Sequence, residues 1–146
     1  MIDYRWIFRA LLVQGIILKT RPAKSAEAYK TVWTDEGSPL IVITKQIQKK
    51  LQKVVDVPVE IGMRYAQPSI EAGIQKLVDQ GVTEIVLFPL YPQYAMSTTE
   101  TVIEKAEEVR KKNFPTIKIN YIQPFYNRDI YINCLAESIK EKLPEN

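Results

Sequence analysis

The sequence contains no histidine, one cysteine and only five glycines in its 146 residues. Without histidine, no imidazole is present to act as a general base, to activate a serine or cysteine nucleophile, or to bind a metal ion. The single cysteine, Cys134, excludes an internal disulfide framework and indicates a reducing compartment, so we expect a cytoplasmic protein. Cys134 lies between Ile132 and Leu135 in a helical pattern, so we expect it to be buried.

Long apolar runs are also missing. No stretch approaches the roughly 20 apolar residues that a membrane-spanning helix needs. The segment Tyr4–Val13 has the pattern of an amphipathic helix that ends near Gly15. We expect it to pack on the core, and contact with a membrane surface or a partner is the alternative.

Positive and negative charges nearly balance one another, except at the start of the chain. The net charge is +3, but residues 1–34 carry +4 and residues 35–146 carry −1. A basic start suggests an anionic partner, although a solvated surface explains the charge equally well. Since no extended basic stripe follows, we expect no nucleic acid to bind.

The rest of the chain alternates between strand and helix patterns. A helix is predicted to start at Ser38-Pro39 and to continue to Val54. Three strand-then-helix units follow, with strands at Val57–Met63, Glu84–Leu90 and Ile117–Ile122 and helices from Pro68 to about Gln80, from Ser97 to about Lys112, and at Asp129–Leu143. Such repetition predicts an α/β fold, a three-layer parallel sheet flanked by helices.

We interpret residues 1–146 as one partial domain. Residues 1–37 would form N-terminal helices and an anion-binding loop, and residues 38–146 a helix followed by the three units. In flavodoxin-like sheets the first strand lies inside the sheet, whereas this chain opens on helices. We therefore expect an interior strand to be absent. The isolated chain should then self-associate, close its sheet differently or remain partly unfolded.

Ligands of open α/β sheets bind outside the carboxyl ends of the strands. That rule selects three loops, which contain Arg64 and Tyr65, residues 91–99, and residues 123–126. Aromatic rings gather there beside Met63 and Met96, which suits a large planar ligand. The alternative is that the rings only close the edge of the sheet, but the cluster favours a site.

A second group of residues suits an anion. Arg21, Lys24 and the Tyr29 hydroxyl are donors, and Ser38 opens a helix whose first N–H groups are free. Together they could hold one or two carboxylates or phosphates. Neither GxGxxG nor GxxxxGKS/T occurs, which excludes the common phosphate loops. Surface charges beside a capped helix are the alternative.

Three segments resemble the first half of ferrochelatases: RPAKSAEAYKTVWTDEGSPL at residues 21–40, MRYAQPSIEAGI at 63–74 and EIVLFPLYPQYAMSTTETV at 84–102. The resemblance covers essentially the whole chain, begins after the family's first strand and stops before its second half. It implies a chelatase-like fold of two similar halves with porphyrin bound between them.

The resemblance also assigns roles to residues by motif position. Arg21, Lys24, Tyr29 and Ser38 match residues that hold the porphyrin propionates. Arg64 and Tyr65 match residues that line the pocket near the macrocycle, and Tyr94, Ser97, Thr98 and Thr99 match a loop that supports it. Met63 is a further candidate contact to the porphyrin because of its place beside the aromatic rings. Ala95 departs from the serine that is common in the family at that position.

The implied activity is insertion of ferrous iron into a porphyrin in haem biosynthesis, with iron as a substrate and no cofactor bound by this chain. The family's catalytic histidine and its metal-side glutamate belong to the second half. We therefore expect no catalytic or metal-binding residue here, an inactive isolated chain, and the C-terminal half of the enzyme as partner. The alternative is a non-catalytic module that binds a porphyrin or another planar anion. Protoporphyrin and coproporphyrin both remain open as substrates.

Overall fold

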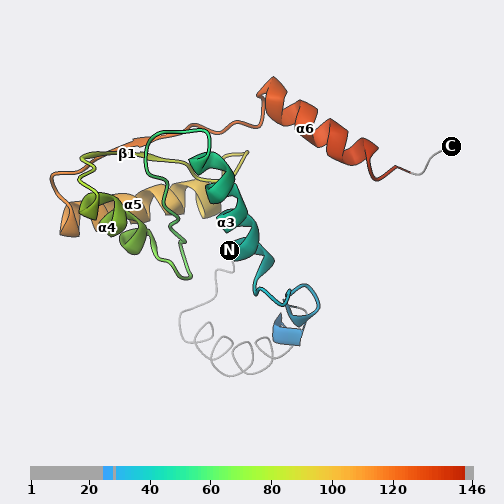
Figure 1. Cartoon of the computed structure of the whole chain (residues 1–146), viewed down its shortest axis with the longest axis horizontal. Coiled ribbons are helices and arrows are strands. Elements are labelled where there is room, and N and C mark those ends of the chain that lie inside the picture. The colour runs from blue at the N-terminus through green and yellow to red at the C-terminus, as the bar shows by residue number, and fades with distance from the viewer. Residues whose placement is uncertain (1–24, 28, 144–146) are drawn as a thin grey trace, which may run out of the picture. The chain divides into compact units, whose positions relative to one another are not determined.

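The structure is a computed structural model that describes residues 25–27 and 29–143 (Figure 1). The chain divides into two compact units, Met1–Val54 and Val55–Asn146. The predicted helix at Tyr4–Val13 and the candidate anion ligands Arg21 and Lys24 lie outside the described residues. The interpretation of the chain as one domain stays a prediction.

In the first unit, a tight turn leads into helix α3, Pro39–Gln52. Thr34 and Gly37 exchange backbone hydrogen bonds of 3.0 and 2.9 Å, and the φ of Gly37 is +110°. That φ favours glycine, so Gly37 allows the chain to reverse at this point. Ser38 is the N-cap and Pro39 the first helical residue, which confirms the predicted start of the helix.

The second unit contains α4 (Ile70–Asp79), β1 (Glu84–Leu87), the π-helix η2 (Met96–Glu100), α5 (Thr101–Asn113), β2 (Lys118–Tyr121) and α6 (Asp129–Lys140). β1 and β2 are parallel, with Glu84 opposite Lys118 and Leu87 opposite Tyr121. Helix α5 connects the two strands, and α4 lies beside it (Figure 1). A parallel strand pair joined through a helix confirms the α/β class.

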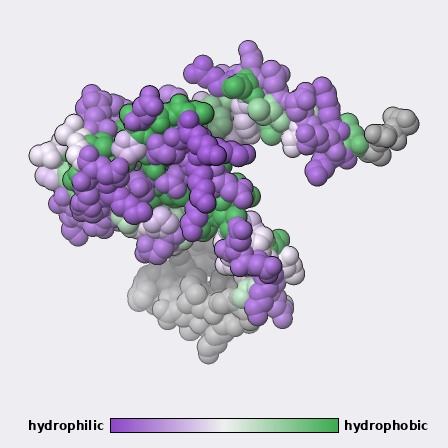
Figure 2. Space-filling model, viewed as in Figure 1, coloured by the Kyte–Doolittle hydropathy of each residue, from purple (hydrophilic) through white to green (hydrophobic). Residues whose placement is uncertain are grey.

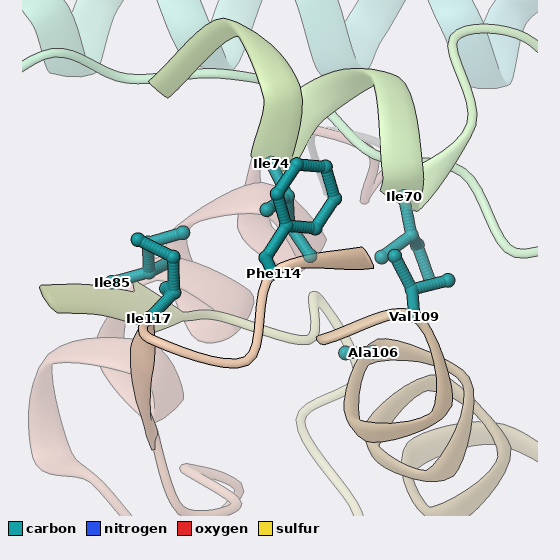
Figure 3. Packing of buried hydrophobic residues seen from close by; sticks show 7 residues of the cluster. All are labelled: Ile70, Ile74, Ile85, Ala106, Val109, Phe114 and Ile117. Carbon is teal, nitrogen blue, oxygen red and sulfur yellow. The ribbon is translucent and has the colours of Figure 1, made fainter. Parts of the chain in front are cut away.

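One small hydrophobic core holds this unit together. Its buried members come from α4, β1, α5 and the connection from α5 to β2, and they are Ile70, Ile74, Ile85, Ala106, Val109, Phe114 and Ile117 (Figure 3). Side chains alternate along β1: Ile85 is buried, whereas Val86 is 62% exposed. Since successive residues of a strand face opposite sides, α4 and α5 cover the face that carries Ile85.

The predicted strand at Val57–Met63 is not confirmed. Between described residues the segment forms one isolated parallel bridge, from Met63 to Ser69, and the sheet described has two strands, β1 and β2. The end of the segment packs closely on α4: a Cβ on Gly62 would lie 2.9 Å from the Cα of Ile70. Gly62 therefore lies directly against the start of α4.

The helix predicted from Ser97 to about Lys112 starts as η2, which contains Ser97, Thr98 and Thr99 and has Ala95 as its N-cap, and continues as α5. One further expectation needs correction. Cys134 is exposed, since α6 contains no buried residue. Figure 2 shows hydrophobic side chains at the surface of this helix among hydrophilic ones. Across the described ranges, no helix combines the length and apolar character that a membrane crossing would require.

Candidate functional site

The loops that follow β1 and β2 meet at the carboxyl ends of these strands. The carbonyl oxygen of Pro92 accepts hydrogen bonds from the backbone N–H groups of Phe125 and Tyr126, at 2.9 and 3.0 Å. Phe88 and Phe125 pack edge to face with their ring centroids 5.4 Å apart. The structure therefore confirms that two of the three loops selected from the sequence come together.

Arg64 links the remaining loop to the same region. Its Nε donates to the carbonyl oxygen of Thr101, 37 positions away, at 3.1 Å. Its guanidinium carbon lies 4.6 Å from the ring centroid of Tyr65, close enough for a cation–π contact. Tyr65 is 82% exposed, and Met63, two residues earlier, is half-buried. Arg64 and Tyr65 are thus presented beside the start of α5.

The threonine hydroxyls after β1 are used within their own loop. Thr98 donates to the Ala95 carbonyl at 3.3 Å, and Thr99 donates to the Gln93 carbonyl at 3.4 Å. Thr99 is only 3% exposed. These hydroxyls satisfy the backbone of an irregular turn and so give the loop its shape. Ser97 differs, because it is exposed and its hydroxyl makes no hydrogen bond to any described residue.

Tyr94 offers its ring more readily than its hydroxyl. Partial desolvation, a hydrogen bond to the Glu100 carboxylate, and the charges of Glu100 and Glu104 together raise the pKa of the Tyr94 phenol. The phenol therefore stays protonated at neutral pH. Its side chain is 54% exposed, so a face of the ring remains available to a planar ligand.

In the first unit, Tyr29 lies in an open hollow lined by Ser25, Ala26, Tyr29, Lys30 and Trp33. The rings of Tyr29 and Trp33 pack edge to face, with centroids 6.1 Å apart and planes at 86°. A Cβ on Gly37 would lie 3.9 Å from the indole Nε1 of Trp33, so the turn brings Trp33 close to the start of α3. The side chain of Ser38 makes no capping hydrogen bond there.

A family model for ferrochelatases matches residues 1–146. The chain belongs to the ferrochelatase family. It is 45% identical to the ferrochelatase of Ectopseudomonas mendocina and 43% identical to that of Pseudomonas syringae pv. syringae, in each case over 99% of this chain and 43% of the relative. The ferrochelatase of Stutzerimonas stutzeri is 41% identical over 99% of the chain and 42% of the relative. The resemblance read from the motifs is confirmed, and the chain spans less than half the length of these ferrochelatases.

Carboxylates of this ferrochelatase-family chain do not gather into a metal site in the part that the structure describes. Among the Asp, Glu and Cys side chains that the structure describes, no three are placed to hold a metal ion. Glu107 is bound by two neighbouring side chains. It accepts from Nε and Nη2 of Arg110 at 3.0 and 2.9 Å, and from the hydroxyl of Tyr121.

These contacts shift the pKa values of the Glu107 carboxyl group and the Tyr121 phenol. The hydrogen bonds from Arg110 and Tyr121 lower the pKa of Glu107. Burial, followed by the bond to Glu107, raises the pKa of Tyr121 to about 12. Nη1 of Arg110 also donates to the Ile117 carbonyl at 3.4 Å. The polar side-chain groups of Glu107, Arg110 and Tyr121 therefore all have partners. The cluster joins α5 to β2 and serves the fold of the family's first half.

Sequence reasoning missed Thr101 and Trp33. Thr101 contributes a backbone carbonyl to Arg64, and an acceptor of that kind leaves no trace in residue type. Trp33 could have been found from its position four residues after Tyr29, because residues at that spacing lie together in a helical turn.

Proposed function

We propose that this chain is part of a ferrochelatase, the enzyme that inserts ferrous iron into a porphyrin in haem biosynthesis, and that it supplies residues that bind the porphyrin. The observation that carries the proposal is the hydrogen bond from Arg64 to Thr101. This bond holds the Arg64 loop beside the start of α5, and the Pro92 carbonyl joins the loops after β1 and β2. The two contacts together bring the predicted ligand loops next to one another. Membership of the family supports the same function.

Within this site, each residue type has a physical task. The exposed faces of Tyr65 and Tyr94 and the thioether of Met63 contact the flat macrocycle through dispersion and stacking. The guanidinium of Arg64 and the hydroxyl of Ser97 meet polar groups at its edge. Thr98 acts on the shape of the loop, since its hydroxyl donates to the Ala95 carbonyl.

The propionates are bound by a second set of residues, Arg21, Lys24, Tyr29 and Ser38. Ser38 stands before the first turn of α3, where backbone N–H groups have no helical acceptor and its own side chain supplies none. A carboxylate placed there would gain hydrogen bonds and a favourable helix dipole. The exposure of Tyr29 supports this assignment, as does the basic start of the chain.

The chemical step requires residues that this chain does not contain. Inserting a metal into a porphyrin removes two pyrrole protons and delivers a partly dehydrated cation, so it needs a base and metal ligands. The sequence has no histidine for either task. We place the catalytic groups in the C-terminal half of the enzyme, treat ferrous iron as a substrate, and expect this chain to hold no cofactor and to be inactive alone.

The finer features of the fold and setting belong to the same proposal. Val86 on the second sheet face and Ile130, Leu135 and Ile139 on α6 are exposed, which supports a three-layer sheet that is completed when these surfaces are covered. Exposed apolar surface of this kind also favours self-association of the isolated chain. One unpaired cysteine supports a cytoplasmic setting.

A non-catalytic porphyrin-binding module is the second candidate, favoured by the complete absence of histidine. Three measurements test the candidates, and the last one separates them. Soret-band titration of the purified chain with protoporphyrin IX should show binding, and the chain alone should insert no iron or zinc. Adding the part of the Ectopseudomonas mendocina ferrochelatase that this chain does not match should then restore insertion.

Each outcome has a meaning. Insertion by the chain alone would contradict the assignment of the catalytic groups to the other half. Binding without insertion, even when that complementary part is present and folded, would favour the module. Absence of porphyrin binding by both the chain and the complemented pair would overturn both candidates.

A further inference from the structure

Thr101 connects the Arg64 loop to the turn that carries Ser97. Its hydroxyl donates to the carbonyl oxygen of Thr98 at 2.9 Å and reaches that of Ser97 at 3.5 Å. Its own carbonyl accepts from Nε of Arg64 at 3.1 Å. Thr98 and Thr99, in contrast, direct their hydroxyls only to carbonyls between residues 93 and 95.

The hydroxyl of Thr101 meets an irregular stretch of backbone. Met96–Glu100 forms a π-helix, and the N–H of Thr101 donates to the Thr98 carbonyl instead of the Ser97 carbonyl, four residues back, that an α-helix would use. The Thr98 carbonyl thus accepts from both the N–H and the hydroxyl of Thr101, and the hydroxyl also lies 3.5 Å from the Ser97 carbonyl. Valine has nearly the same shape as threonine but could not replace this donor.

The backbone carbonyl of Thr101 orients the side chain of Arg64. Because Nε is bonded to the Thr101 carbonyl, the two Nη atoms point away from that bond as a planar fork. No ion pair with Arg64 exists among the described residues. The ring of Tyr65, 4.6 Å from the guanidinium carbon, supports the fork on one face.

We propose that Thr101 is a positioning residue, which holds the Arg64 guanidinium and the Ser97 turn in one fixed relation so that both meet the same porphyrin. This rests on the proposed function. Thr101 itself does not touch the ligand: it acts through its carbonyl on Arg64 and through its hydroxyl on the backbone of residues 97 and 98.

The test compares the whole 146-residue chain with two variants. Thr101→Val removes the hydroxyl at nearly constant volume, and Thr101→Ser keeps it. The first readout is the Arg64 Nε–H signal in a proton–nitrogen NMR spectrum, together with its exchange rate with water. The second is the dissociation constant for protoporphyrin IX. In Thr101→Val the Nε proton should lose its protection, and the dissociation constant should rise about 10-fold, the usual effect of losing a hydrogen bond to a charged group. Thr101→Ser should keep both values.

Thr98→Val is the matched control, because it removes a hydroxyl from the same turn that has no link to Arg64. It should leave the Arg64 Nε–H signal unchanged. Amide protection in β1 and β2 reports whether each variant keeps the fold. An Arg64 Nε–H signal that is the same in wild type and Thr101→Val would overturn the proposal, whatever happens to the affinity.

Separate measurements cover two further outcomes: a wild-type chain that binds no porphyrin, and a Thr101→Val variant that does not fold. If the wild-type chain binds no porphyrin, the proposed function fails, yet the Nε–H signal still tests the Thr101 link. If Thr101→Val does not fold, Arg64→Lys examines the link from its other end. Without Nε, the amide signals of Ser97 and Thr98 should shift, and unchanged signals would overturn the proposal.

Discussion

A methyl group on Gly73 would lie only 2.7 Å from the carbonyl oxygen of Ile61. Gly73 is buried in the middle of α4, where glycine normally costs a helix about 1 kcal/mol relative to alanine. Here the missing side chain lets the helix approach the backbone of residues 61 and 62 directly. The contact fixes the chain just before Met63 and Arg64, and so relates the fold to the candidate site.

Gly73→Ala should therefore destabilise the chain. Helix propensity alone predicts a gain, but the clash with a backbone atom forces a shift that typically costs about 1–3 kcal/mol. Urea denaturation followed by circular dichroism measures the free energy of unfolding. Gln75→Ala, at an exposed position of the same helix, should change it by less than about 0.5 kcal/mol. A more stable Gly73→Ala variant would show that the helix and the segment move apart freely.

The same contact explains where sequence reasoning succeeded and failed. Apolar periodicity placed α3, α4, α6, β1 and β2 correctly, since each buries or presents one face. The segment Val57–Met63 has the apolar alternation of a strand, but its close contact with α4 depends on Gly73, which follows it by at least ten residues. A contact between two backbones leaves no pattern in the apolar residues, so the sequence did not reveal it.

For the candidate site, the sequence predicted the loops but not how they are fixed. Arg64, Tyr65 and Tyr94 could be selected because the ends of parallel strands share an edge. The acceptors that hold these loops are the carbonyls of Pro92, Gln93 and Thr101. Every residue has a carbonyl, so only the structure reveals which ones are used.

Glu107→Gln should make the stability of the chain less dependent on pH. Hydrogen bonds lower the folded-state pKa of Glu107 below its ordinary value of 4.5. The stabilisation is therefore complete above pH 4.5 and is lost as the pH falls through the lower folded-state pKa. At pH 7 the wild type should be more stable than the variant by about 1–2 kcal/mol, and the difference should vanish in acid.

Urea midpoints at pH 7, 4.5 and 2.5 check this dependence. Glu137→Gln is the control, because Glu137 forms an ion pair of the same spacing with Lys140, and both side chains are more than 70% exposed. It should change the stability by no more than about 0.5 kcal/mol at any pH. Equal effects of the two substitutions would show that the Glu107 cluster adds nothing beyond a surface pair.

Arg21→Ala should weaken porphyrin binding by the chain about 10-fold, because a hydrogen bond to a carboxylate contributes about 1.5–3 kcal/mol. Fluorescence titration with protoporphyrin IX measures the dissociation constant. Lys112→Ala removes one positive charge from the last turn of α5 and should leave the constant unchanged. Equal losses in both variants would assign the effect to net charge, and an unchanged constant for Arg21→Ala would make Arg21 an ordinary surface residue.

Cys134 should react with a thiol reagent in the folded chain as fast as a free cysteine does. The residue is exposed in the structure, whereas its place between Ile132 and Leu135 suggests burial. The structure and the sequence pattern describe different states of the amphipathic helix α6. In the structure, α6 presents its apolar side chains to water, whereas the pattern suggests that they are covered. Labelling with Ellman's reagent in the absence and presence of urea distinguishes them. Fast labelling without urea supports the uncovered helix. Labelling that appears only on unfolding would show that α6 packs on another surface, most simply in a self-associated chain, and light scattering on the same sample would then report a dimer or a larger assembly.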